Sequence, residues 1–264
     1  MPSWRRSAKA LHWRYLVVES GGKPPFDGVI FLPGLLCDER LFAPQVDSLA
    51  AVVNSAGEQL YPTEVAHLGD YDSIESMAQA VFENTRFERF ALVGLSMGGA
   101  LAMNMARMAP QRVERMALFD ANPGTDDERR RANRRRQLAE ATRVGVGEFT
   151  RRELIDLYLA PDSRTPELVD LTVAMAERHG IATYERQLQA LMNRSDSRPY
   201  LADYEGRALV LCGELDRMCS PTLHEEMAQL LPHSTLVVLP GIGHLATVEA
   251  PLAVNAALLE FLQS

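Results

Sequence analysis

Short apolar runs alternate with longer amphipathic segments along most of this chain. Five runs have the length and the bounding residues of buried strands: residues 28–32, 90–93, 115–119, 208–211 and 235–239. Strands that alternate with helices in this way predict a parallel sheet covered by helices on both faces. Residues 11–19 predict one more strand near the amino end, at a sheet edge.

The segments between these runs have the spacing of amphipathic helices. They predict helices at residues 73–83, 99–108, 221–231 and 251–262. The first of these helices has a capping-box pattern, with Asp72 as the N-cap and Glu75 three residues later. Pro221 and Pro251 stand near the first turns of the last two, where proline suits a helix start.

Residues 124–204 interrupt the alternation. This stretch is rich in helix formers with amphipathic spacing, contains no convincing strand, and is divided by prolines into several short helices. A chain of 264 residues commonly forms one α/β domain. We therefore expect a catalytic domain made of residues 1–123 and 205–264, into which a helical cap of residues 124–204 is inserted.

Charge excludes some classes of partner. The net charge of −8 weakens attraction to phosphate backbones and to anionic lipid, so neither nucleic acid nor a membrane is expected as a partner. Six of the eight residues from 129 to 136 are arginine, directly after Asp126, Asp127 and Glu128. Acids at a helix start followed by bases suit the helix dipole, so we favour a solvated helix face over an anion site there.

Cysteine usage points to a reducing compartment. Cys37, Cys212 and Cys219 form an odd, sparse set without CxxC spacing, which predicts neither a disulfide framework nor a zinc site. The first ten residues carry bases, but no sustained apolar core of a secretion signal follows them. The longest uncharged run, residues 90–106, is just short of bilayer length and contains several glycines. These observations favour the cytoplasm.

The motif Gly94-Leu95-Ser96-Met97-Gly98 fits G-x-S-x-G, and it stands between an expected strand and an expected helix. That context is what a nucleophile elbow requires. Glycines at both ends let the chain turn tightly around a serine that is held in a strained conformation. Ser96 is therefore the candidate nucleophile, and the following helix places its positive dipole end at the developing charge.

A serine hydroxyl needs a base, and the base needs an oriented acid. Asp216 follows the strand at 208–211, and His244 follows the strand at 235–239. The order Ser, Asp, His is the one that this kind of fold uses. Asp120 is a rival for the acid because it also ends a strand, but it could instead begin the turn at residues 120–124.

A tetrahedral intermediate also needs donors for its oxyanion. The backbone amide of Met97, directly after the nucleophile, is one candidate. The second should come from the loop after an earlier strand, and the amide of Leu35 is the best candidate there. The expected oxyanion hole therefore consists of two backbone groups, Leu35 and Met97.

Together these motifs resemble the α/β-hydrolase superfamily: LPGL at 32–35, GLSMGG at 94–99, GELD at 213–216 and GH at 243–244. The resemblance spans nearly the whole chain, and it is most specific to the bacterial carboxylesterase, enol-lactonase and C–C bond hydrolase branch. It implies an α/β-hydrolase fold, a mostly parallel sheet flanked by helices, with an inserted helical cap. Many relatives carry His-Gly where this chain has Pro33-Gly34. Ser96 argues against the epoxide hydrolases and haloalkane dehalogenases, which use aspartate at the elbow.

These residues predict a serine hydrolase that cleaves a small ester or lactone through an acyl-enzyme on Ser96. No metal ligand set and no cofactor are expected. C–C bond or thioester hydrolysis, and a cofactor-free oxygenase or lyase on the same fold, stay open as alternatives. Substrate identity and oligomeric state also stay open, a homo-oligomer included. Cap side chains should set selectivity; Tyr158, His179 and Tyr184 are worth testing as contacts, although packing or a surface position is favoured for each.

Overall fold

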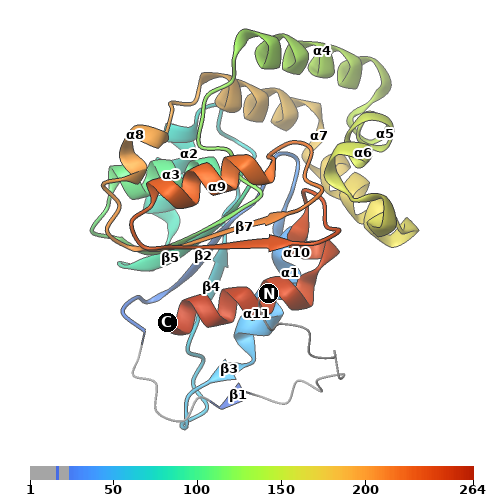
Figure 1. Ribbon diagram of the computed structural model, residues 1–264. Helices are drawn as coiled ribbons and strands as arrows, with labels where there is room; N and C mark the ends of the chain where they lie inside the picture. Colours follow the sequence, from blue (N-terminus) through green and yellow to red (C-terminus); the bar gives the residue numbers. More distant parts are fainter. Residues whose placement is uncertain (1–15, 18–23) are drawn as a thin grey trace.

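The computed structural model describes residues 16–17 and 24–264, and its centre is a six-stranded sheet (Figure 1). All neighbouring strands of this sheet are parallel, in the order β4-β2-β5-β6-β7-β8. The strands are β2 (Gly28–Leu32), β4 (Thr63–Val65), β5 (Phe90–Leu95), β6 (Val113–Phe119), β7 (Arg207–Gly213) and β8 (Ser234–Leu239). The five strands expected from the apolar runs are confirmed.

Helices cover both faces of the sheet (Figure 1). On one face lie α2 (Ile74–Asn84), α3 (Met97–Met108) and α9 (Pro221–Leu230). On the other lie α1 (Ala43–Ala50), α10 (Ala246–Glu249) and α11 (Pro251–Gln263), with the short helix η1 (Glu39–Phe42) before α1. Because both faces are covered, β5 is entirely buried, as expected of a central parallel strand.

Two details of the sequence prediction need correction. Ser73, not Asp72, is the N-cap of α2, and its side chain accepts a hydrogen bond from the Ser76 amide at 3.1 Å. Ser76, rather than Glu75, closes the capping box, because its hydroxyl accepts from the Ser73 amide. Of the expected strand at 11–19, only Leu16–Val17 (β1) lies within the described residues. It pairs with β3 (Val52–Val53) in a separate two-stranded sheet.

A long helical insertion separates β6 from β7. Its elements are α4 (Glu128–Val144), α5 (Val146–Phe149), the π-helix η2 (Thr150–Leu154), α6 (Ile155–Tyr158), η3 (Pro161–Ser163), α7 (Pro166–Asn193) and α8 (Arg198–Leu201). The structure describes all of residues 124–204 and contains no strand among them. Helices α4 to α7 lie beyond one end of the sheet (Figure 1). The division into a catalytic domain and a cap stays a prediction.

Two further observations concern the whole described part of the chain. None of its helices combines the length and the apolar character that crossing a bilayer requires. Cys37, Cys212 and Cys219 are all free and buried.

Candidate active site

Ser96 stands on the tight turn between β5 and α3. Its backbone has φ 56° and ψ −111°, a conformation that residues other than glycine rarely adopt. The Ser96 amide donates to the carbonyl of Phe119 at 2.9 Å, which fixes the turn to β6. A Cβ on Gly98 would overlap the carbonyl oxygen of Leu32, and a Cβ on Gly94 would overlap that of Gly98. The two motif glycines are therefore required because backbones approach closely at the turn.

The Ser96 side chain is accessible although its surroundings are buried. Every other residue from 90 to 106 is buried, whereas Ser96 is partly exposed. It lines a cavity of about 660 Å³ together with Leu35 and Met97. A cavity of this size accommodates a small-molecule ligand. The strained turn thus presents one hydroxyl to a site that a substrate can enter.

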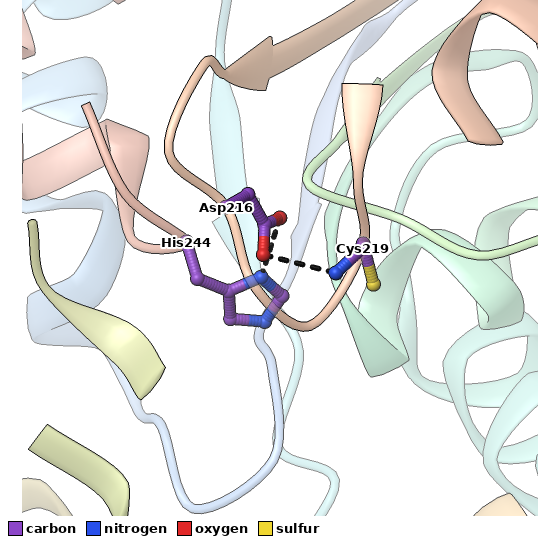
Figure 2. Close-up of side chains that lie close together, drawn as sticks. All are labelled: Asp216, Cys219 and His244. Atoms are coloured by element: carbon purple, nitrogen blue, oxygen red, sulfur yellow. Dashed lines mark hydrogen bonds and ion pairs between the residues drawn. The ribbon is translucent and has the colours of Figure 1, made fainter. Parts of the chain in front are cut away.

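Asp216 and His244 form a buried hydrogen-bonded pair (Figure 2). His244 Nδ1 lies 2.8 Å from Asp216 Oδ2. The other carboxylate oxygen, Oδ1, accepts from the amides of Met218 at 2.8 Å and Cys219 at 2.9 Å. Because Nδ1 faces a carboxylate, the imidazole proton belongs on Nδ1, and Nε2 is left as the base.

Two residues that the sequence did not identify in this role hold the His244 loop. The main-chain oxygen of Tyr158 accepts from the His244 amide at 2.9 Å, and its ring stacks on the imidazole with centroids 5.7 Å apart. The Glu249 carboxylate accepts from the amides of Gly243 and Leu245, both at 3.1 Å. Tyr158 ends α6 in the insertion, so the insertion itself helps to position the imidazole.

The three side chains singled out in the insertion pack against other residues, which is the favoured interpretation. Tyr158, His179 and Tyr184 are absent from the lining of the Ser96 cavity. His179 Nε2 lies 3.0 Å from the carbonyl oxygen of Cys37, and Tyr184 is fully buried against Phe149. Tyr184 therefore packs within the insertion, whereas Tyr158 and His179 pack the insertion against the loops that follow the sheet strands.

Asp120 has a different environment from Asp216. It is fully buried, and its carboxylate accepts from the amides of Gly213 at 2.9 Å and Ala246 at 3.4 Å. Burial, followed by the charge of Asp216, raises the pKa of Asp120 well above its usual value. Asp120 therefore links β7 to the segment after His244, and the imidazole bonds to the other carboxylate.

The loop after β2 carries the predicted oxyanion donor. Leu36 has φ 58°, and its amide donates to Gln187 Oε1 of α7 at 2.9 Å. A Cβ on Gly34 would stand 3.5 Å from Ser96 Cβ, so this loop lies directly against the elbow. Leu35 and Met97, the two predicted donors, both line the cavity of Ser96. Nothing in the sequence indicated that Gln187, some 150 positions away, holds this loop.

Asp216, Cys219 and His244 also place one potential metal-ligand atom each within 4.8 Å of one another. Both Asp216 oxygens, however, already accept hydrogen bonds. Burial, together with the charges of Asp216 and Asp120, raises the pKa of the Cys219 thiol well above its usual value, whereas a metal binds the thiolate. The arrangement suits an oriented imidazole better than a metal.

Comparison with known proteins adds a family model described as alpha/beta hydrolase fold, which matches residues 62–251. The dihydrolipoyllysine-residue acetyltransferase component of the acetoin cleaving system of Pseudomonas putida is 28% identical over 74% of this chain, which spans only 51% of that protein. A putative carbamate hydrolase, RutD, of Yersinia enterocolitica is 26% identical over 94% of this chain and 91% of its own length.

Among solved structures, the enol-lactonase from Burkholderia xenovorans LB400 superimposes with a TM-score of 0.77. The match covers 92% of this chain and 93% of that one, at 21% sequence identity. Identity at this level establishes a shared fold and leaves the chemistry to be argued from the site.

Proposed function

Because this chain belongs to the α/β hydrolase fold family, we propose that it is a serine hydrolase that cleaves a small carboxylic ester or lactone. Family membership supports an enzyme of the hydrolase type; the bond and the nucleophile belong to the proposal. One observation carries it. Among residues 90–106, from β5 through most of α3, Ser96 is the one residue that is not buried, and it lines a cavity.

The parallel sheet supports the assignment of the base. Strands β5, β7 and β8 all run in the same direction, so the residues that follow them gather at one edge of the sheet. Ser96 follows β5, Asp216 follows β7 and His244 follows β8. Met218 and Cys219, whose amides bond to Asp216, line the same cavity as Ser96.

In the proposed mechanism, Ser96 Oγ attacks the carbonyl carbon while His244 Nε2 takes the hydroxyl proton. Asp216 keeps the other imidazole proton on Nδ1 and stabilises the imidazolium. The amides of Leu35 and Met97 donate to the oxyanion of the tetrahedral intermediate. The imidazolium then gives its proton to the leaving alkoxide, and a water activated by His244 releases the acid from the acyl-enzyme.

Labelling with an uncharged fluorophosphonate tests the nucleophile. Ser96 Oγ should displace fluoride from phosphorus and form one adduct, which peptide mass spectrometry should map to Ser96. Folded Ser96→Ala protein and heat-denatured protein should both remain unlabelled. A label on another serine, or none on the folded protein, would overturn the proposal.

A substrate panel tests the bond. Aryl acetates and simple lactones should be hydrolysed, and Ser96→Ala should lower kcat by about 10³-fold or more. Carbamates belong in the panel because of the name of the Yersinia relative, and thioesters and C–C bond substrates because they share the carbonyl attack. Turnover of only these alternatives, with Ser96 labelled, would keep the serine mechanism and reject the ester assignment.

A further inference from the structure

Arginine side chains dominate the charge of the cavity in front of Ser96. Among the residues that the structure describes, five arginines line it, against one acid, Asp127. The five are Arg129, Arg130, Arg134, Arg194 and Arg217. The molecule as a whole carries a net charge of −8, so this cavity opposes the overall charge. A concave surface of one sign concentrates ligands of the opposite sign.

Two of these arginines are already paired within the protein. Asp126 is fully buried, and its carboxylate bonds to Arg134 and, at 2.9 Å, to Arg194. Arg194 also donates to the carbonyl of Gly124 at 2.9 Å, which fixes its guanidinium. These two side chains form part of the cavity wall and have less capacity left for a ligand.

The other three arginines keep their charge available. Arg129 and Arg130 are exposed at the start of α4, and neither makes an ion pair with any acid in the described part of the chain. Arg217 is exposed on the loop after β7, where its one hydrogen bond to a described residue is long, 3.5 Å, to the Asp156 carbonyl. Arg129 and Arg130 come from the insertion and Arg217 from a loop of the sheet, and all three line the same cavity, where one ligand could meet them.

From this arrangement we infer that the substrate carries an oxyanion group, a carboxylate or a phosphate, which Arg129, Arg130 and Arg217 bind while the scissile carbonyl lies at Ser96. The inference rests on the proposed function. Guanidinium groups donate paired N–H bonds that match the planar geometry of such oxyanions. Neutral esters should therefore be poorer substrates than their anionic counterparts.

Matched ester pairs test this inference, because each pair differs in one charge. Two such pairs are 3-acetoxybenzoate with its methyl ester, and mono-4-nitrophenyl adipate with its methyl ester. The first pair has the charge in the leaving group, and the second has it in the acyl group. A third acetate, 3-acetoxyphenyl phosphate, separates phosphate from carboxylate recognition. We expect kcat/KM to favour the anion at least about tenfold in one of the pairs or in the phosphate, mainly through KM.

Arginine variants test which side chains cause the preference for the anionic ester. In the double variant Arg129→Gln/Arg130→Gln, the ratio of kcat/KM for the anion over the neutral ester should fall by about tenfold or more. The matched control is Arg135→Gln/Arg136→Gln on the same helix, because these exposed arginines pair with Glu128 and Glu153 and do not line the cavity. The control should keep the ratio of the wild type. Added salt should lower the ratio in the wild type, since the arginines are exposed.

Equal turnover of the anionic and neutral esters by the wild type, or a preference that survives in the Arg129→Gln/Arg130→Gln variant, would overturn the inference. Fluorophosphonate labelling of Ser96 in each variant separates this failure from that of the proposed function. A labelled wild type without an anion preference rejects only the oxyanion site. An unlabelled wild type rejects the serine mechanism.

Discussion

Asp216 and Asp120 are both buried carboxylates, yet only Asp216 bonds to the imidazole, at 2.8 Å. Replacing Asp216 by asparagine keeps the shape but removes the charge, and the amide can present a donor to Nδ1. His244 would then adopt the wrong tautomer, with its proton on Nε2. We expect kcat to fall by about 10²–10⁴-fold in Asp216→Asn, with the fold intact by circular dichroism.

The variant Asp120→Asn is the matched comparison, because Asp120 is also a buried carboxylate. The raised pKa of Asp120 favours the uncharged acid, so an amide changes its charge little, and the amide oxygen can still accept from Gly213. We expect kcat to fall much less than in Asp216→Asn, within about tenfold. Near-normal turnover in Asp216→Asn beside collapse in Asp120→Asn would transfer the role of the acid to Asp120.

At the residue scale, the sequence could identify candidates that stand in a motif or directly after a strand. Ser96, Asp216 and His244 all have such a position. Gln187 and Glu249 act through backbone amides that lie close only in the folded molecule. A glutamine or a glutamate within a helix carries no local signal of such a partner, so sequence reasoning could not separate them from ordinary polar residues.

Helix α9 is joined to the loop after β6 through one buried histidine. His224 Nε2 accepts from the Ala121 amide at 2.9 Å, and Nδ1 lies 3.0 Å from the Ser220 carbonyl oxygen. This geometry requires the neutral ring with its proton on Nδ1. Burial accordingly lowers the pKa of His224 below its usual value. Protonation of His224 at Nε2 would place its N–H against the N–H of Ala121.

This pairing makes the stability pH-dependent. Below about pH 6.5 His224 becomes protonated in the unfolded chain. In the folded protein it stays neutral until the pH reaches its lower pKa. The contribution of His224 to the free energy of unfolding is therefore complete above about pH 6.5. It is lost as the pH falls from there toward the lower pKa of the folded protein, at up to about 1.4 kcal/mol per pH unit. Urea unfolding between pH 8 and pH 5 should show this slope reduced in His224→Gln. The exposed His233→Gln should retain it; equal slopes in all three proteins would contradict the assignment.

At the element scale, periodicity predicts long elements and misses short ones. The five expected strands have four or more apolar or half-buried positions, whereas β3 has only two residues. Strand β4, at one edge of the six-stranded sheet, has only three residues, all partly buried. Too few positions are present in such strands to establish a period of two. The kink of α7 is likewise set by one residue, Gly180 with φ 72°.

At the scale of the molecule, the arginine-rich segment has no apolar stripe, so its sequence does not show which face of the helix points into the protein. Residues 129–136 form part of α4, as expected, and the exposed arginines Arg135 and Arg136 agree with a solvated face. Arg129, Arg130 and Arg134 instead face the Ser96 cavity. Which face of this helix points inward depends on where the insertion returns to the sheet, and no local feature of the sequence encodes that position.

The insertion leaves and rejoins the sheet-forming part of the chain at one place. The Ser197 amide donates to the Pro123 carbonyl at 2.8 Å, and Arg194 donates to the Gly124 carbonyl. Asp126 lies between the two ends and binds both Arg134 and Arg194. Burial alone would raise the pKa of Asp126, but the two guanidinium groups outweigh it and hold that pKa below its usual value. The junction therefore depends on a charged carboxylate.

Removing that carboxylate should weaken the junction. Asp126→Ala leaves Arg134 and Arg194, with side chains 15% and 5% exposed, without their shared anion, so the free energy of unfolding should fall by about 3 kcal/mol. Asp170→Ala is the control, because its pair with Arg151 is exposed and should contribute less than about 1 kcal/mol. Hydrogen exchange should rise in α4 and α7 of Asp126→Ala before it rises in β5 and β6, since the ends of the insertion are released while the sheet stays paired. Losses of equal size in the two variants, or exchange that rises throughout the sheet at once, would show that the insertion is held by its apolar packing and not by this charge.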